Sequence, residues 1–147
     1  MSNKTLKLKI ATPERVVFNG DVDQVVLPST EGEITILPNH VPLISSLSSG
    51  YIVASQNNEL IPMAVVGGFI QVEKDGVVIL ADFAEHITEI TDERIQEAHN
   101  RAQKLSDTKE KLSPEELEQL ERELEQVNTR RKIAGKWKGK KYRKLNI

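Results

Sequence analysis

The spacing of apolar residues changes near residue 84, and that change limits the folds open to this chain. Before it, apolar and charged residues alternate, as in Leu6, Leu8 and Ile10, which predicts half-buried strands. After it, apolar residues recur at steps of three and four, which predicts helices. The first such set comprises Ile95, Ala98, Ala102 and Leu105. We therefore expect a β domain over residues 1–86 and a helical domain over residues 87–147.

The β domain is divided into short apolar runs separated by turn residues. The runs are residues 16–18, 22–27, 34–37, 51–54, 61–66, 69–72 and 77–80. Turn sequences such as Glu31-Gly32 and Asp75-Gly76 lie between almost all of them. Many short strands at this spacing predict an all-β sandwich or flattened barrel. Gly67-Gly68, inside the apolar strand pattern of residues 61–72, indicates a bulge or a close backbone approach.

The helical domain carries two helix start signals. Thr91 is suited to cap a first helix, with Asp92 and Glu93 facing the positive end of its dipole. Residues 113–116, Ser-Pro-Glu-Glu, form a capping box with proline at the first helical position. The second helix then has one narrow apolar stripe, Leu117, Leu120, Leu124 and Val127. Two such helices predict an antiparallel hairpin, and so thin a stripe predicts weak docking and freedom to move.

Charge is distributed unevenly, although the formal net charge is only −2. The last eighteen residues hold nine basic side chains and no acidic one, whereas residues 85–129 hold six basic and thirteen acidic ones. Such a tail predicts a negatively charged partner. Because Trp137 and Tyr142 lie among the cations, a nucleic-acid-binding module is one reading of it. A solvated terminus is the other.

Residues that would carry chemistry are scarce. There is no cysteine, and the spacing of His40, His86 and His99 does not match a metal site. Phosphate-loop, dinucleotide-binding and hydrolase motifs do not occur, and no nucleophile is paired with a base. No apolar run approaches the ~20 residues that cross a bilayer, and the start leads directly into a strand. The sequence thus predicts a cytosolic protein that is not an enzyme, has no cofactor and binds partners.

Residues 28–43, PSTEGEITILPNHVPL, resemble the signature of the epsilon subunit of the F-type rotary ATP synthase. Residues 67–72 and 78–82 resemble the next two strands of that family, and a helical hairpin follows as the family would have it. The resemblance covers roughly residues 5 to 130. It implies a flattened sandwich of about ten strands followed by a regulatory hairpin.

The resemblance also implies partners and a role. The sandwich would join the gamma shaft to the c ring of a proton- or sodium-driven ATP synthase, with Glu33 and His40 as the c-ring contacts. The complex would lie on the cytoplasmic face of an energy-transducing membrane, a bacterial inner membrane or a plastid thylakoid, with this subunit peripheral and not inserted. The hairpin would extend along gamma toward the alpha and beta subunits and block ATP hydrolysis.

In that extended state, the basic tail would meet acidic patches on the beta subunits. The resemblance therefore favours a protein partner for these cations over nucleic acid. The inhibitory cations are then predicted to be Arg130, Arg131, Lys132, Lys136 and Lys138. This tail departs from the family pattern because it is unusually basic and contains Gly135 and Gly139, which are unfavourable inside a helix.

Some family members bind ATP on the hairpin through an Asp and an Arg three residues apart. Here the aligned stretch is Ile-Thr-Asp-Glu-Arg-Ile at residues 90–95, so Thr91 replaces the carboxylate and Ile95 replaces a small alanine. Asp92 is only two residues from Arg94 and points to a different helix face. These departures argue against ATP binding, for which Arg94 and Arg101 are the candidate residues.

Overall fold

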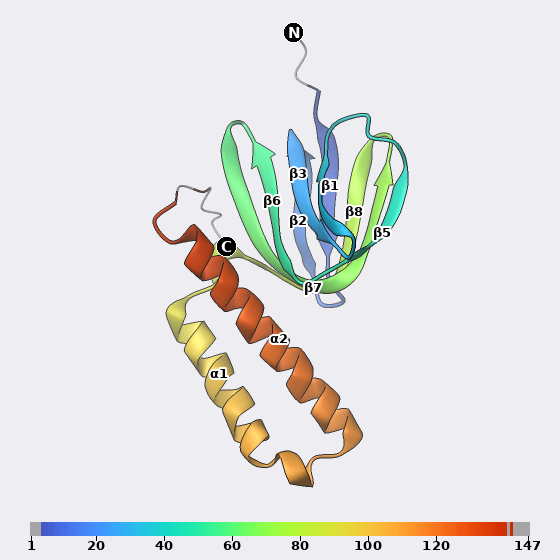
Figure 1. Cartoon of the computed structure of the whole chain (residues 1–147). Helices are drawn as coiled ribbons and strands as arrows, with labels where there is room; N and C mark the ends of the chain where they lie inside the picture. Colours follow the sequence, from blue (N-terminus) through green and yellow to red (C-terminus); the bar gives the residue numbers. More distant parts are fainter. Residues whose placement is uncertain (1–3, 141, 143–147) are drawn as a thin grey trace.

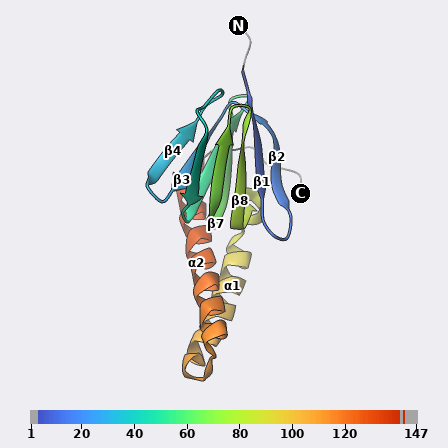
Figure 2. The same cartoon turned by 90° about the vertical axis from the view of Figure 1, so that its right-hand side faces the viewer.

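The computed structural model describes residues 4–140 and 142 of the 147-residue chain, and it shows a β sandwich with a helical hairpin extending beyond one end (Figures 1 and 2). The strands are β1 (Leu6–Ala11), β2 (Val16–Val22), β3 (Gln24–Ser29), β4 (Gly32–Ile36), β5 (Leu43–Leu47), β6 (Gly50–Gln56), β7 (Glu59–Glu73) and β8 (Gly76–His86). The helices are η1 (Ile87–Glu89), α1 (Asp92–Asp107), η2 (Lys109–Lys111) and α2 (Pro114–Trp137). The predicted fold class is confirmed.

One sheet in the order β2-β1-β8-β7-β5-β3-β4 folds over on itself, and β6 closes it by pairing with both β3 and β7. Pairing is antiparallel except between β1 and β8. The second half of β7 lies in one layer with β5, β8 and β1, and its first half lies in the other layer with β6 and β3. We call these the β1 layer and the β6 layer.

The described residues form eight strands, fewer than the ten or so that the resemblance implies. Part of the difference is that β7 joins two of the apolar runs into one strand of 15 residues, with Gly67-Gly68 inside it. Gly68 has φ of +128°, and a Cβ there would lie 2.1 Å from the carbonyl oxygen of Leu80. The predicted close backbone approach is therefore real, and only glycine fits it without moving β8.

The main core lies between the two layers and is built from alternate residues of each strand. Its buried side chains run from Leu6 to Ala84, so none comes from the hairpin. Members such as Ile10, Leu27, Ile52 and Ile79 are completely buried. The sandwich thus has a hydrophobic interior of its own.

Both predicted helix starts are confirmed. The Thr91 side chain accepts a hydrogen bond from the Arg94 amide, and the Ser113 side chain accepts one from the Glu116 amide. Although glycine is unfavourable inside a helix, α2 continues through Gly135 to Trp137. Gly139 lies outside the helix, with φ of +76° just after α2 ends. The first basic residues of the tail are consequently helical.

We predict that a fragment of residues 1–87 folds without the hairpin, because every side chain of the main core precedes residue 85. It should unfold cooperatively, with a melting temperature within about 10 °C of that of the full chain, since ~1 kcal/mol corresponds to about 4–8 °C at this size. A thermal melt followed by circular dichroism checks this. A fragment without a cooperative transition would show that residues 1–86 and 87–147 are not separate domains.

Candidate functional site: two outer faces and a hinge

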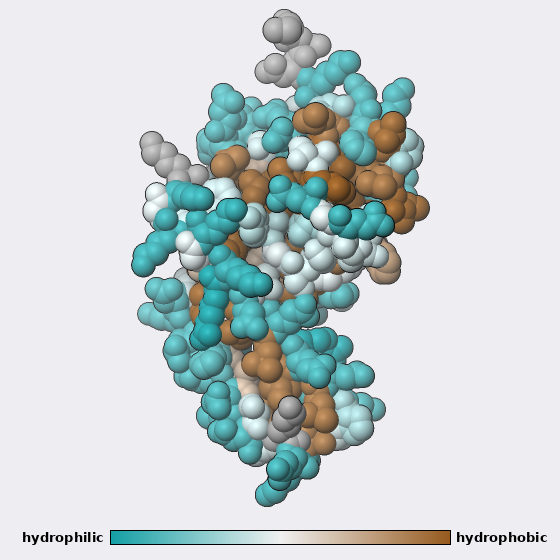
Figure 3. Space-filling view, in the orientation of Figure 1, coloured by the Kyte–Doolittle hydropathy of each residue, from teal (hydrophilic) through white to brown (hydrophobic). Residues whose placement is uncertain are grey.

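The outer face of the β6 layer is covered by the last turns of α2. Ile133 and Trp137 are 0% and 6% exposed and pack on Ala64 and Ile87. Half-buried side chains complete this second apolar cluster: Tyr51, Val53, Ile90 and Tyr142. None of the four residues of the expected leucine stripe belongs to this cluster: Leu120 and Val127 are buried elsewhere along α2, whereas Leu124 is 38% exposed. Figure 3 shows hydrophobic surface along the hairpin below the sandwich. We call the contact between α2 and the β6 layer the hairpin seat.

Polar contacts surround the hairpin seat. The Arg130 guanidinium donates to both carboxylate oxygens of Glu85 at 2.9 and 2.7 Å and lies over the Phe83 ring at 4.8 Å. The Lys136 ammonium donates to the Tyr51 hydroxyl, and the Ser49 hydroxyl donates to Glu125. The Tyr51 hydrogen bond, followed by the Tyr51 and Glu33 charges, raises the pKa of Lys136 above its ordinary value.

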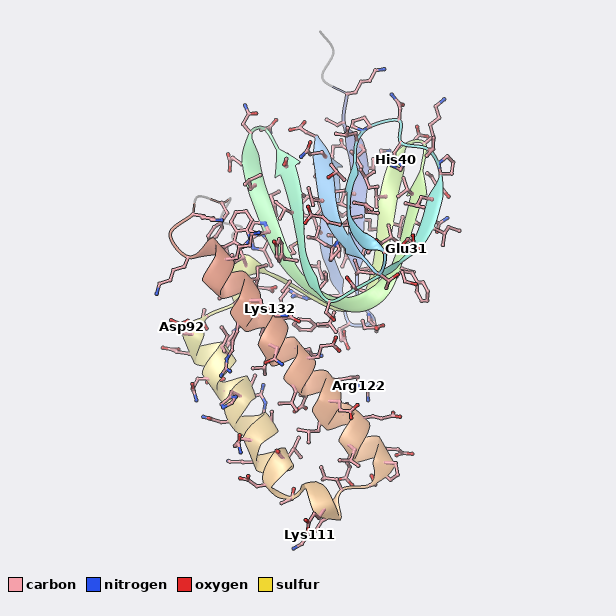
Figure 4. All side chains as sticks on the ribbon, viewed as in Figure 1. Glu31, His40, Asp92, Lys111, Arg122 and Lys132 are labelled. Carbon is pink, nitrogen blue, oxygen red and sulfur yellow. The ribbon has the colours of Figure 1, made fainter. Side chains whose placement is uncertain are left out.

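The predicted inhibitory cations therefore divide into two groups. Arg130 and Lys136 contact the sandwich, whereas Arg131, Lys132 and Lys138 are exposed. Within the described part of the chain, these last three form no hydrogen bond or ion pair. Figure 4 shows Lys132 on the solvent side of α2. The sequence could not separate the groups, because that requires knowing which face of α2 meets the sandwich.

The predicted c-ring residues lie on and beyond β4. Glu33 is exposed, pairs with Pro28 of β3, and is near enough to affect the pKa of Lys136. His40 lies in the loop after β4, with its Nδ1 2.7 Å from the carbonyl oxygen of Val41. In Figure 4, His40 and Glu31 lie at opposite ends of β4. No hydrogen bond or ion pair joins Glu33 to His40 in the described structure.

A groove runs between the start of α1, the end of α2 and the β6–β7 turn. Its walls include Ile90, Asp92, Gln96, Arg131 and Trp137. Arg94 and Arg101, the candidate nucleotide ligands, do not line it. Arg94 instead donates to the Glu89 carbonyl at 3.0 Å. Among the described residues, no group of His, Asp and Glu side chains is arranged to hold a metal ion.

The outer face of the β1 layer carries exposed apolar side chains. Phe69 lies opposite Leu80 across the β7–β8 ladder, and they are 63% and 57% exposed. Val78 and Ile44 lie on the same face, each opposite Gln71. We call Ile44, Phe69, Val78 and Leu80 the outer patch. The predicted strands include Phe69, Val78 and Leu80 but not Ile44, because β5 is not among the apolar runs. The sequence could not show that these residues share one outer face.

The hinge between sandwich and hairpin is fixed by a second ion pair. Arg15 donates to both carboxylate oxygens of Glu89 at 2.6 and 2.7 Å. Burial acts to raise the pKa of Glu89, but the Arg15 hydrogen bonds and the His86 amide outweigh it and lower the pKa. His86 caps η1 by accepting from the Thr88 amide, and burial lowers the pKa of His86.

Comparison with known proteins follows the same division. The family model described as ATP synthase, delta/epsilon chain, β-sandwich domain matches residues 5–87. The ATP synthase epsilon chain of Pelotomaculum thermopropionicum is 45% identical over 103 residues, 70% of this chain and 77% of that one. The chloroplastic epsilon chain of Anthoceros angustus is 40% identical over 100 residues, covering 68% and 72%.

Relatives also extend over the hairpin. The epsilon chain of Gloeobacter violaceus is 38% identical over 130 residues, 88% of this chain and 97% of that one. A chain in the Euglena gracilis mitochondrial ATP synthase structure has a TM-score of 0.67 at 20% identity, covering 88% and 81%, which is a likeness of fold. These comparisons give no support to the nucleic-acid-binding alternative.

We predict that the folded chain loses stability in mild acid because of His86. Its pKa in the folded protein lies below the unfolded value of 6.5, so the unfolded chain binds a proton first as the pH falls through that value. The free energy of unfolding should then fall from pH 7.5 to about pH 5.5. His86→Asn keeps an acceptor for the Thr88 amide and should remove most of this decrease. Urea unfolding at the two pH values checks it, and an undiminished decrease in the variant would contradict it.

Proposed function

The chain belongs to the ATP synthase delta/epsilon family, and from this premise we propose that its sandwich joins the gamma shaft to the c ring while its hairpin restrains ATP hydrolysis. It is an accessory rotor subunit, not a catalytic one. The observation that carries the proposal is the division of the sandwich surface. One outer face holds the chain's own hairpin, and the other presents the exposed outer patch.

The outer patch is the proposed contact for gamma. Its four side chains project from three neighbouring strands of a rigid ladder, and Ile44 is 77% exposed. Contiguous apolar side chains on a folded surface typically mark a protein interface. Covering them would stabilise a complex by ~25 cal/mol per Å² of apolar area removed from water.

The loop after β4 is the proposed contact for the c ring. It carries His40 together with Leu37 and Val41, which are 53% and 71% exposed. Glu33, on the adjacent strand β4, is the proposed second contact for the c ring. The described part of the chain has no helix long and apolar enough to span a membrane. From its similarity to bacterial and chloroplastic epsilon chains, we propose that the subunit is peripheral, on the cytoplasmic face of an energy-transducing membrane, and is held there by its partners.

The hairpin is the proposed brake. The second half of α2, from Glu125 onward, packs on the sandwich outside the main core, so both helices can swing away from the seat without disturbing that core. When extended along gamma, the hairpin would bring Arg131, Lys132 and Lys138 to acidic surfaces of the alpha and beta subunits. These three cations are already exposed in the docked form and need not break a contact to act.

We predict that Leu80→Glu weakens binding to gamma by at least about tenfold, because it would place an unpaired carboxylate in an apolar interface. The variant should remain folded, since Leu80 is 57% exposed and exposed substitutions usually change stability by about 0.5 kcal/mol or less. Titration of purified gamma with each variant measures it. Leu60→Glu is the matched control, because Leu60 is an exposed leucine at the start of β7 that lines the groove and lies outside the outer patch. Equal losses from both substitutions would contradict the assignment of the outer patch to gamma.

We also predict that Arg131→Ala, Lys132→Ala and Lys138→Ala together raise ATP hydrolysis by the reconstituted complex. Single substitutions should do little, because an exposed charge pair contributes only ~0.2–1 kcal/mol. Added salt should act like the triple variant, since the Debye length is ~10 Å at 0.1 M. The control is deletion of residues 88–147, which removes the whole brake. If deletion activates hydrolysis and the triple variant does not, the helices obstruct rotation sterically and the cations are not responsible.

A further inference from the structure

Arg130 differs from the other predicted inhibitory cations in its surroundings. It forms two hydrogen bonds to Glu85, and the two side chains are only 14% and 13% exposed. The remaining face of its guanidinium lies against the Phe83 ring. In the described structure, this is the one ion pair that joins α2 to the sandwich.

Helical spacing explains why Arg130 faces the seat while its neighbours do not. Ile133 and Trp137 follow it by three and seven residues, so all three lie on one side of α2. That side meets the ends of β6, β7 and β8, where Ala64 lies directly opposite Glu85. Arg131 and Lys132 are turned toward solvent.

A charge pair in such surroundings is sensitive to the loss of one member. Removing one side chain leaves the other charge uncompensated under the helix, which costs far more than the loss of an exposed pair. In the undocked chain, the same residual charge is hydrated and costs nothing. A substitution at Arg130 or Glu85 therefore destabilises the docked hairpin selectively.

We propose that Arg130 and Glu85 are a latch that holds the hairpin on the sandwich, so that loss of Arg130 releases the hairpin. Given the proposed function, Arg130→Ala then strengthens the inhibition of ATP hydrolysis, whereas loss of Arg131, Lys132 and Lys138 relieves it. The basic segment thus contains cations with opposite effects on the same activity.

The release can be measured in the isolated full-length chain. Wild type has no cysteine, and Ala64 is completely buried beneath Ile133 and Trp137, so Ala64→Cys reports opening of the seat to a thiol reagent. In this background, Arg130→Ala and Glu85→Ala should each speed labelling on the order of tenfold or more. Lys132→Ala should leave the rate unchanged. The charge-exchanged chain, Arg130→Glu with Glu85→Arg, should be slower than either single alanine variant.

Two controls separate release from unfolding. Ala54→Cys lies in the main core, so its labelling requires unfolding of the sandwich and should not respond to Arg130→Ala. Trp137 is the only tryptophan and is 6% exposed, so its emission should shift to the red in any variant that is mostly undocked. If Arg130→Ala and Lys132→Ala give the same labelling rate in the Ala64→Cys background, Arg130 and Glu85 are not a latch.

Hydrolysis by the reconstituted complex tests the second half of the proposal. With Arg130→Ala it should fall below the wild-type rate, while the triple variant of the exposed cations raises it. An increase with Arg130→Ala would overturn the claim of opposite effects. Failure of the proposed brake is recognised separately, because deletion of residues 88–147 would then leave hydrolysis unchanged while labelling of the thiol introduced by Ala64→Cys still responded to Arg130→Ala.

Discussion

The ladder between β7 and β8 is the constraint on which both outer faces depend. Its register runs from Met63 opposite His86 to Glu73 opposite Gly76, so it spans both layers. Toward one end it sets Phe69 beside Leu80 in the outer patch, and toward the other it sets Ala64 beside Glu85 in the hairpin seat. Gly68 allows the two backbones to approach between these points. Because one continuous ladder carries both surfaces, the sandwich behaves as a fixed platform, and any switching must occur in the hairpin.

The sequence predicted most helices and strands from local patterns. It did not predict which residues of α2 contact the sandwich. The caps at Thr91 and Ser113 were predictable because a cap depends on a few adjacent residues. The hairpin seat was not predictable in this way. The leucine stripe of α2 has a clear helical period, whereas Ile133 and Trp137 are isolated apolar residues inside a basic segment. Glu85 and Arg130 are 45 residues apart, and composition alone cannot pair them.

The candidate site residues show the same limit. The resemblance assigned Glu33 to the c ring, but only the fold shows that Glu33 lies within electrostatic reach of Lys136 on the docked helix. It also assigned five cations one role, whereas the register of α2 on the sandwich gives Arg130 and Lys136 partners in the docked form. A shared motif identifies equivalent residues in related chains. It does not show which face of a helix packs on its neighbour when that helix can dock in more than one way.

Undocking would separate a definable set of residues from the sandwich and leave the hinge intact. Ile133, Trp137, Arg130 and Lys136 would leave their partners on the sandwich, and the hydrogen bond between Ser49 and Glu125 would break. The Arg15–Glu89 pair and the cap of η1 lie before α1 and can persist.

The residues that separate do not all serve docking in the same way. In wild type both latch charges become hydrated on undocking, so their net contribution to docking strength is modest, and the apolar contacts of Ile133 and Trp137 supply most of it. The latch acts mainly on geometry, because any other placement of α2 on the sandwich would leave Glu85 buried without its partner. In wild type, therefore, the apolar side chains of α2 supply most of the docking strength, and the Arg130–Glu85 pair restricts docking to one register.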